Sequence, residues 1–163
     1  MEKSKRMVYI SGALTDMSEG ERQKRREFYE ALGKICEEFG FIVYLPHVYG
    51  DPQLMPDLTP AEINRQDRLA VTLSRLVVAY VGVSSIGVGI EIELAYHSEK
   101  PVILLYEKEK LEKRLISRLV RGNPAVIRQI VFENYEDALS QFREFFARWV
   151  EVNVESSLPE ILK

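Results

Sequence analysis

The chain has 163 residues, a formal net charge of -3 and a sequence pI of about 5.6. This length suits one domain with a single core, and the slight acidic excess excludes a protein that binds DNA or RNA mainly by charge attraction. The lone cysteine, Cys36, excludes an internal disulfide framework and a cysteine-rich zinc site. The two histidines, His47 and His97, lie too far apart in the sequence to suggest a histidine metal site. We therefore expect no metal.

Two further features concern location. The longest apolar run, Leu76 to Val81, is too short to cross a bilayer. The charged residues that follow Met1 lead into only a few apolar residues, so the start does not resemble a signal peptide. Together these features predict a soluble protein of a reducing compartment, and we expect it in the cytoplasm.

The first quarter of the chain predicts a strand, a helix and a second strand. Residues 7–11 form a short apolar run that ends at Gly12, as a buried strand would. Apolar residues at three- and four-residue steps predict a helix over residues 18–39, with Cys36 on its core face. Residues 41–45 form the second short apolar run. This order begins a β-α-β unit.

The middle of the chain begins with a loop that is long for so small a domain. Four of the seven prolines lie between Pro46 and Pro60, which predicts a functional or mobile loop there. Thr59 has the character of an N-cap, with Pro60 in the first helical position, and the helix should run to about Leu73. Residues 76–81 predict the third strand.

The remaining elements continue the alternation. We expect a glycine-containing turn over residues 84–89 and a helix from about Gly89 to Ser98. The later segments are predicted to be a strand over 101–106, a charged helix over about 108–121, a strand over 127–132, and a helix from near Tyr135 past Trp149. Strands that alternate with helices predict an α/β fold. We expect a doubly wound, five-stranded parallel sheet of the flavodoxin-like or Rossmann-like kind, with helices on both faces.

Ligands of such sheets bind at the carboxyl ends of the strands, so the loops after the first and third strands are the candidate site. The loop after the first strand contains small residues from Ser11 to Ala13 that would let backbone N–H groups approach a ligand. After the third strand, Gly87 and Gly89 precede Glu91 in what we expect to be the first turn of a helix. The helical period turns Glu93 to a different face, which leaves Glu91 as the candidate site carboxylate.

Several motifs in this order resemble the nucleoside 2-deoxyribosyltransferase superfamily, and within it the 2′-deoxynucleoside 5′-phosphate N-hydrolase branch. The resemblance extends from about Met7 to Trp149. The motifs that carry it are Val8-Tyr9-Ile10-Ser11-Gly12, Arg65-Gln66-Asp67, Leu76-Val77-Val78-Ala79, Ser85-Ile86-Gly87-Val88-Gly89-Ile90-Glu91, Lys100-Pro101-Val102-Ile103-Leu104 and Ile116-Ser117-Arg118-Leu119-Val120-Arg121-Gly122.

The resemblance implies roles for individual residues. Glu91 would be the nucleophile that attacks C1′ of the sugar, and Asp67 the second carboxylate, which assists departure of the base or holds the sugar. Ser117 would contact the phosphate in the site of the neighbouring subunit of a homodimer. The remaining implied substrate-binding residues are Tyr9, Gly12, Ala13, Leu14, His47, Ser85, Gly87 and Gly89.

The chain also departs from the branch in the loop after the first strand. Ala13 and Thr15 stand where the branch tends to carry a serine and an arginine of the phosphate cradle. Dependence on a 5′-phosphate is therefore an open question, with Thr15, Arg22 and Arg121 as candidates to compensate.

We expect an enzyme that hydrolyses the N-glycosidic bond of (2′-deoxy)nucleoside 5′-monophosphates through a covalent glycosyl-Glu91 intermediate. No metal or organic cofactor is needed for chemistry performed by two carboxylates. One alternative is a nucleoside 2-deoxyribosyltransferase, which passes the glycosyl group to another base, and another is a non-catalytic nucleotide-binding module. The expected partners are a small nucleotide and a second copy of the chain, with no nucleic-acid polymer and no membrane. Residues 1–154 form the expected single domain, and 155–163 an expected flexible tail.

Overall fold

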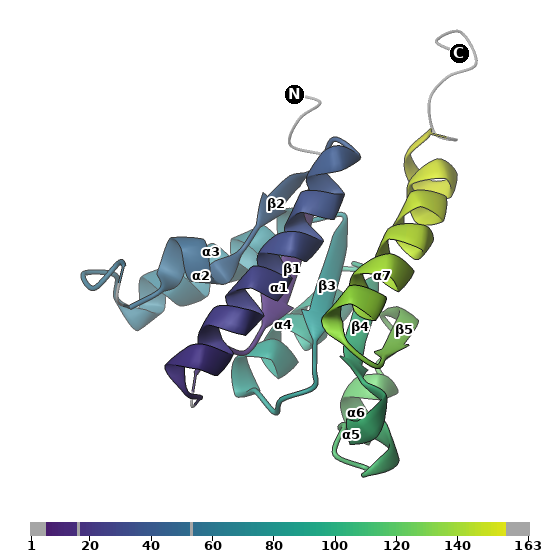
Figure 1. The fold of residues 1–163 in the computed structure, drawn as a ribbon. Coiled ribbons are helices and arrows are strands. Elements are labelled where there is room, and N and C mark those ends of the chain that lie inside the picture. The colour runs from purple at the N-terminus through teal and green to yellow at the C-terminus, as the bar shows by residue number, and fades with distance from the viewer. Residues whose placement is uncertain (1–5, 16, 53, 156–163) are drawn as a thin grey trace, which may run out of the picture.

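The computed structural model describes residues 6–15, 17–52 and 54–155, and the expected tail lies outside these residues except for its first. Five parallel strands form one sheet in the order β2-β1-β3-β4-β5. The strands are β1 (Met7–Gly12), β2 (Ile42–Tyr44), β3 (Leu76–Tyr80), β4 (Val102–Glu107) and β5 (Val126–Phe132). This is the expected doubly wound order, and the chain changes direction across the sheet between β1 and β3 (Figure 1).

The segments that connect successive strands contain helices, and these helices pack against the sheet (Figure 1). They are α1 (Glu19–Glu38), α2 (Pro46–Gly50), α3 (Pro60–Leu73), α4 (Ile86–His97), α5 (Lys108–Glu112), α6 (Arg118–Arg121) and α7 (Tyr135–Val150), which continues as a π-helical turn over Glu151–Glu155. Among the described helices, none has the length and apolar character needed to cross a membrane.

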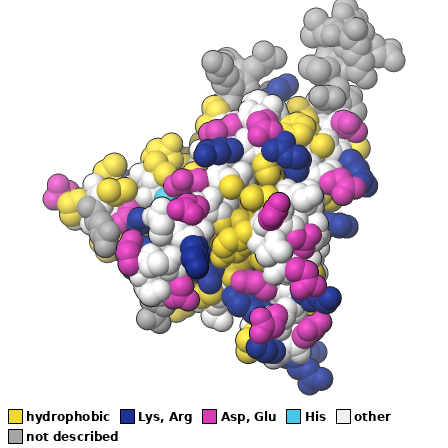
Figure 2. Space-filling model, viewed as in Figure 1, with side chains coloured by type: hydrophobic (Ala, Val, Ile, Leu, Met, Phe, Trp, Pro, Cys, Tyr) yellow, Lys and Arg dark blue, Asp and Glu magenta, His cyan; other side chains and the backbone are white. Residues whose placement is uncertain are grey.

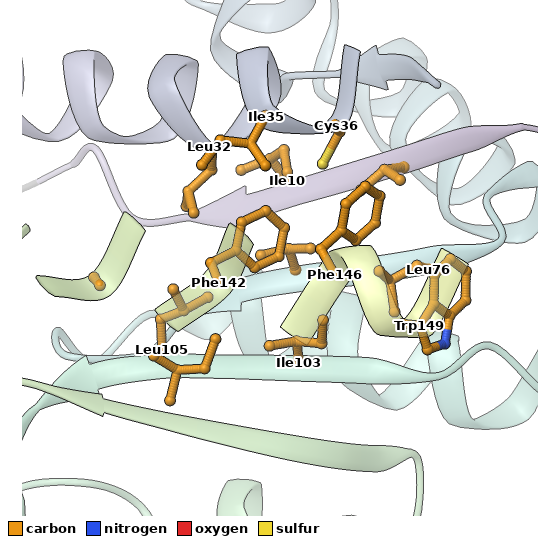
Figure 3. Close-up of a cluster of buried hydrophobic side chains, with 14 of the residues drawn as sticks. Ile10, Leu32, Ile35, Cys36, Leu76, Ile103, Leu105, Phe142, Phe146 and Trp149 are labelled. Atoms are coloured by element: carbon orange, nitrogen blue, oxygen red, sulfur yellow. The ribbon is translucent and has the colours of Figure 1, made fainter. Parts of the chain in front are cut away.

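Two hydrophobic clusters lie on opposite faces of the sheet because successive strand residues point to opposite sides. On one face, α1 and α7 pack over β-strand residues such as Ile10, Ile103 and Leu105 (Figure 3). Cys36 is fully buried in this cluster, as its place in the sequence pattern predicted. On the other face, α3 and α4 pack over the alternate strand residues, among them Tyr9. Figure 2 shows charges of both signs mixed over the viewed face, with apolar side chains between them.

Three predicted elements were wrong in detail. The stretch after β2 is not entirely loop, because Pro46 starts the short helix α2. The helix α4 begins at Ile86, three residues before the predicted start, because the Ser85 side chain accepts a hydrogen bond from the Val88 amide and caps it. The charged helix predicted over 108–121 is two short helices, interrupted near Arg114, whose φ of 56° lies in the left-handed region.

Candidate active site

A cavity of about 460 Å³ lies at the carboxyl ends of β2, β1 and β3, where a doubly wound sheet binds its ligands. The segments that follow these three strands contribute to its wall, together with α1, α3 and α4. The lining residues are Gly12, Ala13, Leu14, Thr15, Arg22, Arg26, Pro46, His47, Gly50, Asp51, Pro52, Ile63, Asp67, Ser85, Gly87, Val88 and Glu91.

Glu91 lies in the second turn of α4, one turn later than predicted because the helix starts earlier. Both of its carboxylate oxygens accept hydrogen bonds from β1: Tyr9 Oη donates to Oε1 over 2.7 Å, and Ser11 Oγ donates to Oε2. Tyr9 and Ser11 are two residues apart on one strand, so both side chains point to the same face. The two donors therefore hold the carboxylate in one orientation.

Burial raises the pKa of Glu91 above its ordinary value, and the negative charge of Asp67 adds to this increase. The hydrogen bonds from Ser11 and Tyr9 act in the opposite direction because they stabilise the ionised carboxylate. Burial likewise raises the pKa of the Tyr9 hydroxyl, which therefore keeps its proton and remains a donor.

Asp67 is the second carboxyl group of the cavity and comes from α3. Its Oδ1 accepts a hydrogen bond of 2.9 Å from Tyr44 Oη, and the Tyr44 ring stacks between those of Tyr9 and Tyr49, with centroids 5.3 and 4.7 Å away. Burial raises the pKa of Asp67, while the hydrogen bond from Tyr44 lowers it. Two carboxyl groups in different surroundings, one of which feels the other's charge, can share the roles of acid and nucleophile.

The part of the cavity wall that α1 contributes is charged. Arg22 and Arg26 lie one turn apart on α1, and Arg26 forms an ion pair with the buried Asp51. His47 lies beside them, with Nε2 3.3 Å from Glu30 Oε1, and burial lowers the pKa of its imidazole. The sequence analysis named Arg22 as a candidate for the phosphate cradle, but it did not single out Arg26 or Asp51. The spacing of four between the arginines was the available signal, but only the tertiary fold shows that this face meets the cavity.

The glycines have different roles. A Cβ on Gly12 would overlap the ring of Tyr29, whose hydroxyl donates to the Ala13 carbonyl over 3.0 Å. Gly12 is thus required by internal packing, although it also lines the cavity. A Cβ on Gly87 would have only Ser85 Oγ nearby, at 3.8 Å, and therefore enters open space beside the amide end of α4.

Most of the predicted residues meet in the first cavity, with three exceptions. Tyr9 does not line it, but lies fully buried beneath Glu91. Gly89 and Ser117 line a separate, adjoining cavity of about 320 Å³, together with Leu115 and Val120. In one chain, Ser117 caps α6 by accepting from the Val120 amide. The described residues contain no group of three or more side chains suited to hold a metal ion.

One curated relative decides the family. The protein named "Putative 2′-deoxynucleoside 5′-phosphate N-hydrolase 1" from Thermofilum pendens (strain DSM 2475 / Hrk 5) is 34% identical over 105 residues, which are 64% of this chain and 67% of that protein. The chain belongs to the 2′-deoxynucleoside 5′-phosphate N-hydrolase family. This confirms the resemblance seen in the sequence, although no family model matches the chain.

Two solved structures share the fold of this N-hydrolase family member. The CMP N-glycosidase BcmB of Clostridium botulinum superposes with a TM-score of 0.64 at 21% identity, over 85% of this chain and 98% of that one. The solution structure of BlsM has a TM-score of 0.67 at 24% identity, over 96% of this chain and 99% of that one. At these identities the comparison establishes the α/β fold.

The open space at Gly87 leads to a prediction. Gly87→Ala should lower kcat/KM for a nucleotide at least about tenfold, because the new methyl group occupies space that a ligand at the α4 amides would use. The free energy of unfolding should stay the same or rise by up to about 1 kcal/mol, since alanine favours a helix over glycine. Thermal unfolding and steady-state kinetics measure the two effects.

Gly20→Ala is the matched control, because it also adds a methyl group to an early helical position with nothing within 4 Å, but outside the cavity. Equal kcat/KM values for Gly87→Ala and Gly20→Ala would show that no ligand approaches Gly87.

Proposed function

We propose that the chain hydrolyses the N-glycosidic bond of (2′-deoxy)nucleoside 5′-monophosphates, with Glu91 as nucleophile and Asp67 as acid and base. Family membership makes the chain an enzyme of the N-glycosidase class. The observation that carries the proposal is the pair of carboxyl groups in one cavity, with both oxygens of Glu91 held by donors from β1.

The proposed reaction has two steps. In the first, a Glu91 oxygen forms a bond to C1′ while the bond from C1′ to the base nitrogen breaks, and Asp67 gives its proton to the departing base. In the second, Asp67 takes a proton from water, whose oxygen attacks C1′ and displaces Glu91. The products are the free base and (deoxy)ribose 5-phosphate, and both carboxyl groups return to their starting states.

The amide end of α4 supports a place for the 5′-phosphate. Helix N-termini attract anions, and Ser85, Gly87 and the loop with Thr15 line the cavity there. Of the candidates to replace the branch's missing arginine, Arg22 lines the same cavity, whereas Arg121 donates to Gln129 and lines neither described cavity near α4. We therefore infer that Arg22 supplies the cation for the phosphate.

The names of similar proteins agree with this proposal, since one denotes a deoxynucleotide N-hydrolase and another a CMP N-glycosidase. Location in the cytoplasm and independence from cofactors stay predictions.

A panel of nucleosides and 5′-monophosphates, with and without an added free base, tests the function. Base release without an acceptor, together with a sugar 5-phosphate, is the expected result. Base exchange that requires an acceptor would assign a transferase instead, and binding without turnover would assign a non-catalytic module. Nucleosides cleaved as fast as their monophosphates would contradict the phosphate subsite.

We also propose that the active form is a homodimer in which Ser117 contributes to the partner's site. Exposed apolar side chains line the second cavity: Ile86 is 86% exposed and Leu115 62%. Such side chains beside a polar site are typical of a protein interface. A second copy that covers them would also bring its own α6 region toward the first cavity.

Mixing two inactive variants tests the shared site. Ser117→Asp should repel the phosphate, and Glu91→Gln should remove the nucleophile, so that each homodimer has little activity. A heterodimer of the two has one intact site if Ser117 acts across the interface. Random mixing should then restore about a quarter of wild-type activity, because half of the dimers have one good site of two. No recovery on mixing, or a monomer in sedimentation equilibrium, would contradict the shared site.

A further inference from the structure

The ion pair between Arg26 and Asp51 is a built feature of the first cavity that the proposed reaction does not use. Both side chains line the cavity, and they are only 21% and 7% exposed. Among the described residues, Arg26 Nε is buried and has no hydrogen-bond partner. A buried pair of charges costs desolvation free energy, so its presence in a ligand cavity calls for a role in binding.

The sheet order places this pair at the opposite end of the cavity from the amide end of α4. Asp51 follows β2 and α2, the Ser85–Gly87 turn follows β3, and β1 lies between those two strands. In a nucleotide, the base and the 5′-phosphate also lie on opposite sides of the sugar. With the phosphate at α4 and the sugar at Glu91, the base extends toward Arg26 and Asp51.

The charges of the pair favour this orientation over the reverse one. A phosphate dianion beside Asp51 would meet a carboxylate, and the positive charge of Arg26 is already balanced by it. A neutral base presents hydrogen-bond donors and acceptors side by side, and the pair offers an acceptor next to a donor. The pair therefore complements a base edge better than a phosphate.

We propose that Arg26 and Asp51 read the edge of the base and select nucleotides whose base carries an exocyclic amino group over their deaminated counterparts. This inference rests on the proposed function and names the substrate class of the same site. Asp51 accepts from the amino group, and Arg26 donates to the adjacent ring nitrogen or carbonyl oxygen.

Deamination reverses the pattern at two adjacent positions of this edge. It replaces the amino donor by a carbonyl oxygen, which then faces the acceptor oxygens of Asp51. The carboxylate cannot donate a hydrogen bond to this oxygen. The adjacent ring nitrogen gains a proton, and its N–H then faces the donor groups of Arg26, so two unfavourable contacts replace two favourable ones. Asparagine at this position keeps the shape, and its amide can present either an oxygen acceptor or an N–H₂ donor to the base, so it pairs with either kind of base.

The experiment compares kcat/KM within pairs of substrates that differ only in this group, dCMP with dUMP and dAMP with dIMP. In the wild type, the amino-bearing member of at least one pair should be preferred about tenfold or more. In Asp51→Asn the preference should fall to within about threefold of unity. Because the readout is a ratio measured on one preparation, a partly unfolded variant does not distort it.

Glu38→Gln is the matched control, since it removes the carboxylate of another ion pair, with Arg143, that lies outside the cavity. It should keep the wild-type ratio. Equal rates within both pairs in the wild type, or an unchanged ratio in Asp51→Asn, would overturn the inference while base release itself upholds the proposed function. No base release from any of the four nucleotides would count against both.

Discussion

Glu91→Gln should lower the rate of base release at least about 1,000-fold, because the amide is too weak a nucleophile to form the glycosyl ester. The carboxylate is oriented by Tyr9 and Ser11, so the loss concerns the chemical step more than binding. The measurement is kcat in single-turnover and steady-state assays, and wild-type protein quenched during turnover should carry one deoxyribose phosphate on Glu91 by mass spectrometry.

Glu93→Gln is the control, since Glu93 lies on the same helix but is exposed and accepts from Asn123 outside the cavity. Its activity should match the wild type. Undiminished base release by Glu91→Gln would remove Glu91 from the mechanism.

Thermal unfolding of Glu91→Gln tests whether this variant is folded. Because burial raises the folded-state pKa of Glu91, ionisation of this carboxyl destabilises the fold as the pH rises through the interval between its ordinary and its raised pKa. The cost is complete above the raised pKa and absent well below the ordinary pKa. Glu91→Gln should therefore unfold at a higher temperature than the wild type above the raised pKa, and this advantage should disappear as the pH falls below the ordinary carboxyl pKa.

Asp67→Asn should lower kcat/KM, which reports the step of base departure, by about 100- to 1,000-fold, because the base then leaves without a proton. The loss should be much smaller for a 7-methylguanine nucleotide, whose cationic base departs without protonation. The raised pKa of Asp67 also predicts that wild-type activity falls with increasing pH once this proton is lost, and that the variant lacks this alkaline limb.

Asp57→Asn, an exposed change before α3 and outside the cavity, is the control and should keep the wild-type pH profile. If Asp67→Asn slowed the cationic and the neutral bases equally, Asp67 would orient the sugar instead of donating a proton.

Much of the site could be predicted from the sequence because its signals are local. Glycines before a glutamate indicated Glu91, the resemblance to a known family implied Asp67, and the structure places both in one cavity. The strands followed from short apolar runs, and most helices from apolar residues at steps of three and four. The boundaries of α4 and the break near Arg114 were missed, because a serine cap and one left-handed residue leave little trace in such periods.

Contacts between segments that lie far apart in the sequence could be found only from the tertiary structure. The donors to Glu91 come from a strand about 80 positions earlier, and the partner of Arg26 is a loop residue 25 positions later. Gly12, chosen for ligand approach, proved necessary for packing against Tyr29. The short and slightly acidic sequence by itself thus determined the alternation of strands and helices and supplied the two carboxyl groups of the site. The strand order decided which charged side chains face the cavity and which end of the cavity suits a base. It alone brings the ends of β2, β1 and β3 together.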